Sequence, residues 1–421
     1  MKLSLRDQKH IWHPLTQHKT SAPPIAIVKA KGALMWDEDG KEYIDGIASW
    51  YTAMYGHCNE FITSKVTRQM LQLDQVVFTG FTHEPAVELS EKLMAILPSN
   101  QQKIFFNDNG STAVEAAIKM ALQYHFNKGE KRNTLIAFED GFHGDTFGAM
   151  SVSGLSVYNG PFEDYFLKVE RIPVPKDGNL VEVIARLQLL IAENKCAAFV
   201  YEPMVQGAAG MKFHEAEGLN EILKLCKNNN LLCIADEVMT GFGKTGKNFA
   251  SEYIEEKPDV MCLSKSLTAG IAAMSITSCT QKIFDAFLDD DISKGFFHAH
   301  TYSANPLACA AAIAGIDLLS SIEIQEDIRR IERHHRNFSE KIKIHPKVAS
   351  VRQLGVIFAL DLNLEMNRYG ELRNKIFNHF MSDGVFLRPL GNTIYILPPF
   401  VIENEQLEKI YTSIENVLSI L

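Results

Sequence analysis

Short apolar runs alternate with amphipathic stretches along the middle of the chain. The pattern predicts strands at 103–106, 134–138, 196–201, 231–235 and 260–263, because each run is short and apolar. It predicts helices at 85–97, 111–124, 218–227 and 305–319, and Pro85 and Pro306 stand where proline favours the first helical turn. Strands that alternate with helices indicate crossover connections and a mostly parallel sheet.

The two ends of the chain have a different pattern of apolar and polar residues. Near the start, apolar runs at 33–36 and 43–47 flank an Asp37–Gly40 turn, which is a hairpin signal. Beyond 320 the pattern predicts a charged helix at 328–344, strands at 356–360 and 394–397, and a last helix with one apolar face made by Leu407, Ile410, Tyr411, Ile414, Val417, Leu418 and Leu421. With 421 residues in all, we expect two domains. These are a large α/β domain at 56–320 and a smaller α+β domain built from 1–55 and 321–421.

Composition excludes several classes of function. The net charge of -9 argues against a grip on nucleic acid or docking on an anionic membrane, both of which need a basic face. Seven cysteines form no Cys-x-x-Cys pair, and residues 1–10 have no apolar segment typical of a secretion signal. We expect free thiols in a reducing compartment and a cytoplasmic location. The histidines fit no standard ligand spacing, so we predict no metal site.

The first candidate site is 107–112, between a predicted strand and a predicted helix. The free N–H groups of a helix start attract an anion. Gly110 lets the backbone approach a ligand closely, and Ser111 adds a hydroxyl. A bound phosphate fits this arrangement, although an ordinary capped helix explains the same residues.

The second and third candidates follow the next strands. Asp236 and Glu237 end the run at 231–235, where ligands of open α/β sheets bind. The alternative is a helix cap or a metal-ligand pair. Lys265 follows the run at 260–263, where burial would lower its pKa and free its amine to attack a carbonyl. A solvated loop lysine is the commoner explanation of such a residue.

Taken together, the three candidates describe a pocket for pyridoxal phosphate (PLP). This cofactor needs a lysine for its aldehyde, an acid for its ring nitrogen, an anion site for its phosphate and an apolar slot for its ring. His143 looks like an ordinary loop histidine, and Trp12 and Trp36 look like core anchors.

The spaced motifs resemble those of the class III, or ω-type, PLP-dependent aminotransferases. The match runs over residues 11–399 and includes, in order, Gly110-Ser111, Gly141-Phe142-His143-Gly144, Glu202-Pro203, Asp236-Glu237-Val238, the run 240–246 and Ser264-Lys265. The resemblance implies fold type I, with a mostly parallel seven-stranded sheet in the large domain. It also implies an enzyme that transfers amino groups and works as a homodimer with shared active sites.

Within this family the chain is most similar to members that act in biotin biosynthesis. The motifs are Ile11-Trp12-His13-Pro14, Ser49-Trp50, the run 143–148, the run 305–309 and Arg388-Pro389. This implies that 8-amino-7-oxononanoate accepts the amino group and that S-adenosylmethionine donates it. Lysine as donor, or a general ω-amino acid pair, is the alternative, and a non-catalytic binding dimer is a second one.

The resemblance also implies a role for each site residue. Lys265 carries PLP as a Schiff base, and Asp236 pairs with the ring nitrogen. The other cofactor contacts are Gly110 and Ser111 at the phosphate, Thr301 at the phosphate of the partner subunit, and Phe142 and Val238 on the two faces of the ring. The substrate contacts are Trp50, Phe142, Lys265, Ala299 and Arg388, the last holding a carboxylate. Asp145 is a candidate for holding in place the residues that contact the cofactor. Glu202 aligns with a glutamate that pairs with an arginine in relatives.

Six positions depart from the family pattern. Leu15 stands in place of an aromatic residue that contacts substrate, which is why the alternative donors stay open. Tyr51 replaces a tryptophan, Phe142 a tyrosine and Lys244 an arginine, while Ala299-His300 replaces Gly-Pro. None of these changes affects Lys265 or Asp236, so the chemistry is predicted more firmly than the substrate.

Overall fold

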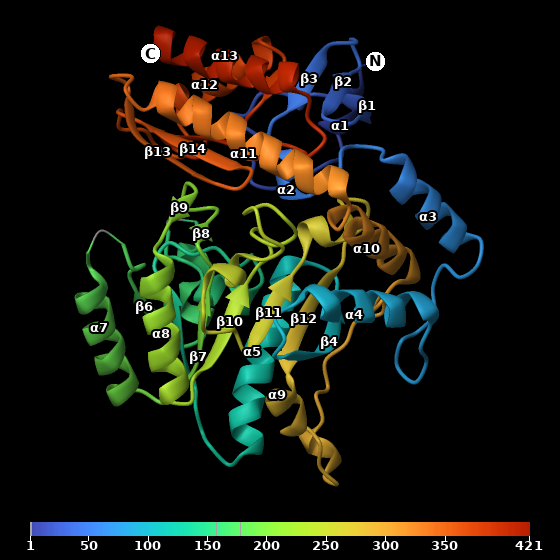
Figure 1. Cartoon of the computed structure of the whole chain (residues 1–421), viewed down its shortest axis with the longest axis vertical. Helices are drawn as coiled ribbons and strands as arrows, with labels where there is room; N and C mark the ends of the chain where they lie inside the picture. Colours follow the sequence, from blue (N-terminus) through green and yellow to red (C-terminus); the bar gives the residue numbers. More distant parts are fainter. Residues whose placement is uncertain (1, 157, 177) are drawn as a thin grey trace.

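A seven-stranded sheet forms the centre of the molecule (Figure 1). The computed structural model describes residues 2–156, 158–176 and 178–421. The strands lie in the order β4 (Gln101–Asn107), β12 (Ser275–Thr280), β11 (Val260–Leu263), β10 (Leu232–Asp236), β7 (Cys196–Tyr201), β5 (Thr134–Phe138) and β6 (Val169–Ile172). Strand β12 alone runs opposite to the other six, so the expected mostly parallel seven-stranded sheet is confirmed.

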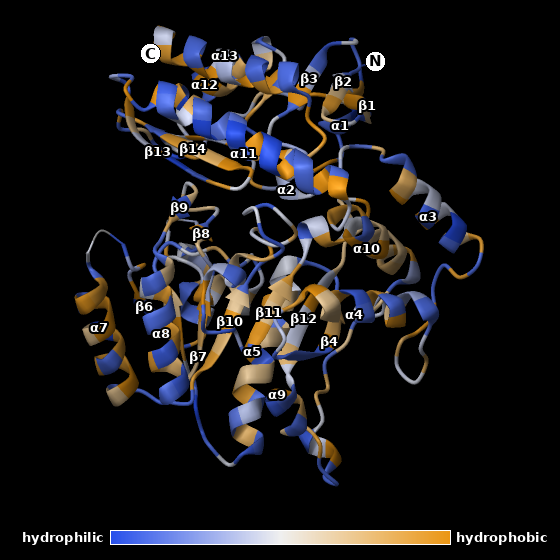
Figure 2. Ribbon diagram, in the orientation of Figure 1, coloured by the Kyte–Doolittle hydropathy of each residue, from blue (hydrophilic) through white to orange (hydrophobic). Residues whose placement is uncertain are grey.

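Both faces of this sheet are covered, and the alternation of side chains along each strand explains how. In β5, Leu135 and Ala137 point to a core shared with α5 (Gly110–Asn127), while Ile136 and Phe138 belong to the core on the other face. The remaining elements of this part are α4 (Glu84–Ile96), α6 (Phe147–Val152), α7 (Leu180–Glu193), α8 (Ala216–Asn228), α9 (Gln281–Asp285), α10 (Pro306–Leu319), η1 (Gly160–Tyr165), η2 (Ala250–Tyr253), η3 (Lys265–Thr268), η4 (Ile292–Lys294), β8 (Val205–Gln206) and β9 (Lys212–Phe213). Figure 2 shows apolar residues along the strands of this sheet and polar residues along much of α8, while α7 is largely apolar.

A second group of elements, drawn from both ends of the chain, lies above the sheet in Figure 1. The N-terminal elements are α1 (Leu3–Asp7), β1 (Ile27–Lys31), β2 (Leu34–Asp37), β3 (Glu42–Asp45) and α2 (Ala48–Tyr51). The C-terminal ones are α11 (Ile322–Ile342), β13 (Val348–Leu354), β14 (Ile357–Leu362), α12 (Glu371–Ser382), β15 (Val385–Phe386), β16 (Thr393–Ile396) and α13 (Asn404–Ile420). Strand β15 pairs with β3, which joins the two ends in one sheet. The boundaries at 55/56 and 320/321 stay a prediction.

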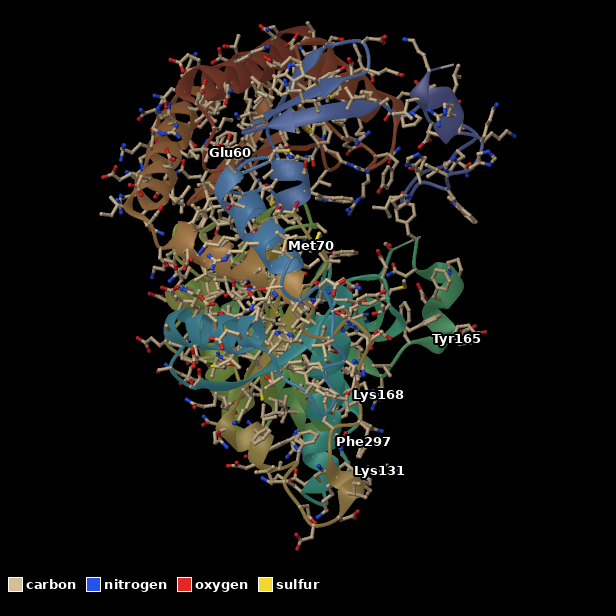
Figure 3. All side chains as sticks on the ribbon, turned by 90° about the vertical axis from the view of Figure 1, so that its right-hand side faces the viewer. Glu60, Met70, Lys131, Tyr165, Lys168 and Phe297 are labelled. Carbon is tan, nitrogen blue, oxygen red and sulfur yellow. The ribbon has the colours of Figure 1, made fainter. Side chains whose placement is uncertain are left out.

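Helix α3 (Glu60–Met70) connects the two groups. Figure 3 labels its ends, with Glu60 near the upper group and Met70 beside the lower one. It packs against α10, which is buried along almost its whole length. Among the described residues no single helix is long and apolar enough to cross a bilayer, although α10 and α11, bent by 67° at their junction, pass that test together.

The pattern located most elements within a few residues. The predicted strands at 134–138, 196–201 and 260–263 coincide with β5, β7 and β11, and the hairpin at Asp37–Gly40 joins β2 to β3. Two predictions fail. Trp12 is 89% exposed, so it is not a core anchor, and Trp36 is only half-buried, under the ammonium of Lys29.

Candidate active site

Lys265 lies just beyond β11, at the carboxyl edge of the sheet. Its φ of 50° is left-handed, which is costly for a residue with a Cβ and is typical of functional sites. Burial lowers the pKa of Lys265, and the charges of Asp236 and Glu202 oppose this only in part. Its Nζ lies 5.3 Å from the ring centre of Tyr51. The prediction of a sheltered, reactive lysine therefore agrees with its surroundings.

Asp236 ends β10, which pairs in parallel with β11 in the register Asp236 to Cys262. Its side chain is buried, and Oδ1 accepts a hydrogen bond from the amide of Val238 at 3.0 Å. Oδ2 lies 2.7 Å from Nδ1 of His143. The carboxylate is thus held from two sides, at the same edge of the sheet as the lysine-bearing turn.

His143 is the main site residue that sequence reasoning underestimated. It is buried, and Nε2 has no partner among the described residues. Burial disfavours its charged form, but the hydrogen bond with Asp236 and the charges of Asp236 and Glu202 outweigh this effect and raise the pKa of His143. It is a loop histidine, as expected, but its hydrogen bond with Asp236 gives it a place beside the candidate site that the prediction did not include. The signal was its motif, which follows β5 at the same edge of the sheet.

The start of α5 offers hydrogen-bond donors without protein partners beside this pair. Asn109 caps the amide of Thr112, and no described residue accepts from the amides of Gly110 and Ser111. The Ser111 hydroxyl accepts from the amide of Asp145 at 3.1 Å, which leaves its own proton for a ligand. This is the only support that the structure shows from Asp145.

Two glycines are required by close packing at this helix start. A Cβ on Gly110 would lie 2.8 Å from Val238 Cγ1. A Cβ on Gly144, whose φ is +128°, would lie 1.9 Å from Ser111 Oγ. Val238 therefore reaches directly over the helix start, and the loop after His143 closes against Ser111.

Phe142 and Glu202 are two further predicted residues near the site, and they are joined by a hydrogen bond. The Phe142 ring is 44% exposed, and its amide donates to Glu202 Oε2 at 3.1 Å. Glu202 follows β7, is buried and also accepts from the amide of Gly207 at 3.0 Å. Burial raises the pKa of Glu202 to about 7, against the lowering effect of the charge of His143 and of these two hydrogen bonds. No arginine among the described residues pairs with it.

Trp50 and Arg388 meet in the second group of elements. The guanidinium of Arg388 lies 4.9 Å from the ring centre of Trp50. The pKa of Arg373, on α12, is lowered chiefly by burial and then by the charge of Arg388. No acidic residue in the described parts of the chain pairs with either guanidinium. Two cations without an anion are suited to a carboxylate ligand.

Tyr51 links these groups to the lysine. It is buried between Lys265 and Tyr395, whose ring centre is 5.9 Å away. Burial raises the pKa of Tyr51 well above its ordinary value, so its hydroxyl stays protonated. The prediction treated Tyr51 only as a replacement for tryptophan. Its place beside the lysine depends on the backbone conformation of the segment, which no pattern indicated.

The segment that carries Trp50 and Tyr51 is a left-handed helical turn. Residues Ala48, Ser49, Trp50 and Tyr51 have φ of 47°, 46°, 67° and 73°, and none is glycine. Each such residue costs about 1–2 kcal/mol, so the surrounding structure must hold the turn in place.

Lys244 is a second buried lysine near the site. It is fully buried, and Nζ donates to the carbonyl of Gly241 at 2.7 Å and to the hydroxyl of Ser266. Burial and then the charge of Lys265 lower the pKa of Lys244 well below its ordinary value. Its hydrogen bonds tie the turn after Lys265 to the loop after β10.

Two predicted site residues, Ala299 and Thr301, and the divergent Leu15 are not brought to this edge of the sheet within one chain. Ala299 and Thr301 are exposed, and the carbonyl of Thr301 accepts from Gln75 at 2.9 Å. Leu15 is 56% exposed, in a left-handed backbone conformation. None of the three has a recorded contact with Lys265 or Asp236 in the described parts of the chain.

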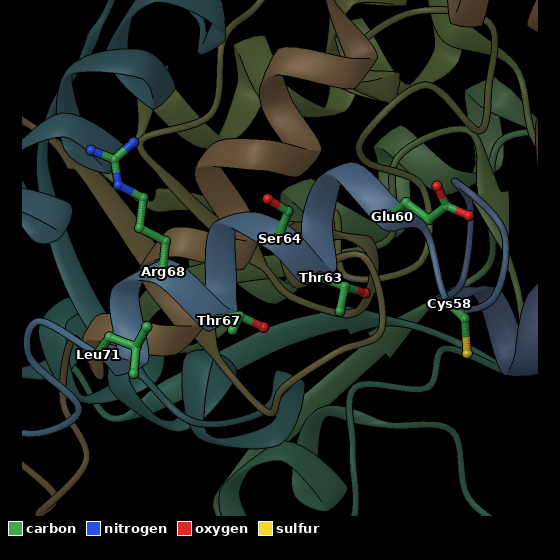
Figure 4. Close-up of a pocket in the computed structure, with 7 residues that line it drawn as sticks. All are labelled: Cys58, Glu60, Thr63, Ser64, Thr67, Arg68 and Leu71. Atoms are coloured by element: carbon green, nitrogen blue, oxygen red, sulfur yellow. The ribbon is translucent and has the colours of Figure 1, made fainter.

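A separate groove of about 620 Å³ lies along α3 (Figure 4). Its lining residues are Cys58, Glu60, Thr63, Ser64, Thr67, Arg68 and Leu71, and none of them belongs to the site above. Over the described residues there is also no group of three or more His, Cys, Asp or Glu side chains that could hold a metal ion.

Comparisons with known proteins agree with this geometry. Residues 15–418 match the family model "Aminotransferase class-III". The chain is 40% identical, over 97% of its length and 98% of the relative's, to adenosylmethionine-8-amino-7-oxononanoate aminotransferase of Synechococcus elongatus. It is 33% identical, over 97% of its length and 95% of the relative's, to the protein of the same name from Staphylococcus aureus.

Solved structures give the same result. The structure of adenosylmethionine-8-amino-7-oxononanoate aminotransferase from Methanocaldococcus jannaschii superposes with a TM-score of 0.94, at 30% identity over 99% of this chain and 98% of that one. An amine transaminase from an uncultivated Pseudomonas species, in a PLP-bound form, superposes with a TM-score of 0.90, at 27% identity over 97% of this chain and 98% of that one. The chain therefore belongs to the class-III aminotransferase family.

Proposed function

We propose that this chain is a PLP-dependent aminotransferase that converts 8-amino-7-oxononanoate to 7,8-diaminononanoate in biotin biosynthesis, with S-adenosylmethionine as amino donor. One observation carries the chemistry: a lysine of lowered pKa and a doubly held carboxylate lie at the carboxyl ends of two paired strands. The names of the relatives supply the two substrates.

The residues present fit PLP. The start of α5 offers free amides and the Ser111 hydroxyl for the phosphate, and Gly110 leaves room for it. Phe142 and Val238 are suited to the two faces of the ring. When bound, PLP supplies an electron-withdrawing ring that takes up the electrons released as a substrate C–H bond breaks.

Each protein group then has a defined task. Asp236 would hold a proton on the ring nitrogen, and the hydrogen bond with His143 keeps its carboxylate oriented. Lys265 would hold the cofactor through Nζ, and its amine, when free, would move a proton at the reacting substrate carbon. Burial lowers the pKa of Lys265, which favours the neutral amine that this task needs.

Arg388 and Trp50 are suited to the acceptor. A guanidinium without a protein carboxylate binds the acid group of 8-amino-7-oxononanoate, and the indole lines its apolar chain. S-adenosylmethionine also carries a carboxylate, so the same arginine serves the donor half of the reaction.

We also propose a cytoplasmic homodimer. The exposure of Ala299 and Thr301 supports their use in the partner's active site, where Thr301 would contact the phosphate. The six buried cysteines among the seven free thiols agree with a reducing compartment.

Transfer from lysine, or between general ω-amino acids, is the second candidate. It is favoured by Leu15, which departs from the family pattern, and by the superposition on an amine transaminase. The deciding experiment incubates the purified holoenzyme with 8-amino-7-oxononanoate and either S-adenosylmethionine or lysine, and measures diaminononanoate. Product with S-adenosylmethionine alone supports the proposal, and product with lysine alone changes the donor. No product with either, but amino transfer among simple ω-amines, rejects the proposed acceptor.

A further inference from the structure

Hydrogen bonds to one buried carboxylate, that of Asp45, hold the left-handed turn Ala48–Tyr51 in place. Asp45, which ends β3, is fully buried, and its Oδ1 accepts from the amide of Ile47 at 3.2 Å. Its Oδ2 accepts from the amide of Ser49 at 2.7 Å and from the Ser49 hydroxyl at 3.0 Å. These bonds fix the backbone on both sides of Ala48, where the unfavourable conformation begins.

His57 holds the Asp45 carboxylate in place. Nε2 of His57 lies 2.8 Å from Oδ2 of Asp45, and this contact pairs the carboxylate with an N–H donor. His57 is itself anchored, because its amide and carbonyl exchange hydrogen bonds with Gly32 at 2.8 and 3.0 Å. The Asp45–His57 pair therefore ties the turn to the N-terminal sheet.

The far end of the turn is tied to the lysine. The Ser266 hydroxyl, next to Lys265, donates to the carbonyl of Tyr51 at 2.9 Å. Between these two anchors the turn presents Trp50 to Arg388 and Tyr51 to Lys265. Because Tyr51 stays tied to Ser266, a shift at the Asp45 end of the turn would move the indole away from the guanidinium and leave Lys265 and Asp236 in place.

We infer that Asp45 and His57 are positioning residues that set acceptor recognition by holding Trp50 in a conformation that the backbone does not favour. The inference rests on the proposed function for the identity of the acceptor. It assigns the pair a role in substrate affinity and not in the chemistry at Lys265.

The test compares Asp45→Asn, His57→Leu and His57→Gln in the holoenzyme. Asp45→Asn keeps the shape but replaces one accepting oxygen by a donor, and His57→Leu removes the N–H. We expect both to raise KM for 8-amino-7-oxononanoate about tenfold or more, with kcat changed less than about threefold. His57→Gln can still donate to Asp45 and should recover most of the affinity lost in His57→Leu.

Asp37→Asn is the matched control. Asp37 lies in the same sheet and also stabilises a turn. Its carboxylate accepts hydrogen bonds from the amides of Asp39 and Lys41 and from the Tyr43 hydroxyl. Its turn carries no site residue, so KM should stay unchanged. An equal rise in KM in Asp37→Asn would show a general effect of the sheet and overturn the inference.

Glycine provides a rescue test. Because glycine adopts positive φ without strain, Ala48→Gly added to Asp45→Asn should recover part of the lost affinity. A double variant no better than Asp45→Asn would contradict the inference.

Fluorescence separates this inference from the proposed substrate. In a holoenzyme with Trp12→Phe and Trp36→Phe, Trp50 is the remaining tryptophan. Acrylamide should quench it more strongly after Asp45→Asn or His57→Leu, and to the original extent after Asp37→Asn. Unchanged quenching in both positioning variants overturns the inference. If the unaltered enzyme fails to use 8-amino-7-oxononanoate, the proposed acceptor fails and the fluorescence result alone decides the role of the pair.

Discussion

His143 donates its Nδ1 proton to a carboxylate oxygen of Asp236 across 2.7 Å, and both side chains are buried. The histidine is a second donor to this carboxylate, beside the amide of Val238, which donates to Oδ1 at 3.0 Å. The two hydrogen bonds fix the orientation of the carboxylate, which the proposed function needs at the ring nitrogen of the cofactor.

Asp236→Asn should lower kcat at least about 100-fold, or about 2.7 kcal/mol in the activation barrier, because an amide cannot stabilise the protonated ring nitrogen. Steady-state kinetics check this. The control is Asp259→Asn, a half-buried carboxylate near the other end of β10 that accepts from the amide of Cys233 at 2.8 Å. Equal losses in both variants would mean that the effect comes from the strand and not from the site.

Glu202 should make the chain less stable as the pH rises. Its pKa of about 7 in the folded chain exceeds the ordinary 4.5, so the folded state binds the proton more tightly than the unfolded state. The resulting stabilisation is present below about pH 4.5 and is lost as the pH rises towards 7. In Glu202→Gln this loss should disappear, and the difference is worth up to about 3 kcal/mol.

Urea unfolding of the cofactor-free chain at several pH values measures this effect. The raised pKa of His143 gives a slope of the same sign, so the comparison is between the slopes of the two proteins. Parallel curves for the unaltered chain and the Glu202→Gln variant would show that Glu202 titrates normally.

Gly144→Ala should weaken cofactor binding more than Gly110→Ala. At Gly144 the added Cβ would lie 1.9 Å from Ser111 Oγ, and the φ of +128° is unfavourable for any residue with a Cβ. At Gly110 the added Cβ would contact only the Val238 side chain, at 2.8 Å. Equilibrium dialysis with PLP gives the two affinities. Gly160→Ala is the control, because its Cβ would meet no atom within 4 Å. Equal affinities for the Gly110 and Gly144 variants would argue against this packing at the phosphate.

Arg388→Lys should raise KM for the acceptor about 10- to 100-fold, because lysine cannot form the paired hydrogen bonds of a guanidinium to a carboxylate. Cofactor absorbance should stay unchanged. Arg68→Lys, on the outer face of α3, is the control. A normal KM in Arg388→Lys would place the carboxylate elsewhere, with Arg373 as the nearest candidate.

The sequence predicted the site best where a residue's role depends on the end of a strand. Asp236 is the last residue of β10, and Lys265 and Gly110 come shortly after β11 and β4. An apolar run that stops at a polar residue is visible without coordinates. Strands such as β12 and β6 were missed, because β12 reads Ser-Ile-Thr-Ser-Cys-Thr and gains its burial only from both neighbours.

Residues whose role depends on a distant partner could not be predicted. His143 and Asp236 are 93 positions apart, and Ser266 and Tyr51 are 215 apart. The left-handed turn at Ala48–Tyr51 contains no glycine to signal it, so only the three-dimensional anchors at Asp45 and Ser266 explain it. The same limit applies to Ala299 and Thr301, whose predicted roles require a second subunit.

The covalent bond between Lys265 and PLP is the central claim, and borohydride reduction of the holoenzyme followed by peptide mass spectrometry tests it most directly. We expect a phosphopyridoxyl group on the peptide that contains Lys265, and a folded Lys265→Ala protein without that label, visible cofactor absorbance or activity. A label on Lys244 or another lysine, or an active Lys265→Ala enzyme, would contradict the account.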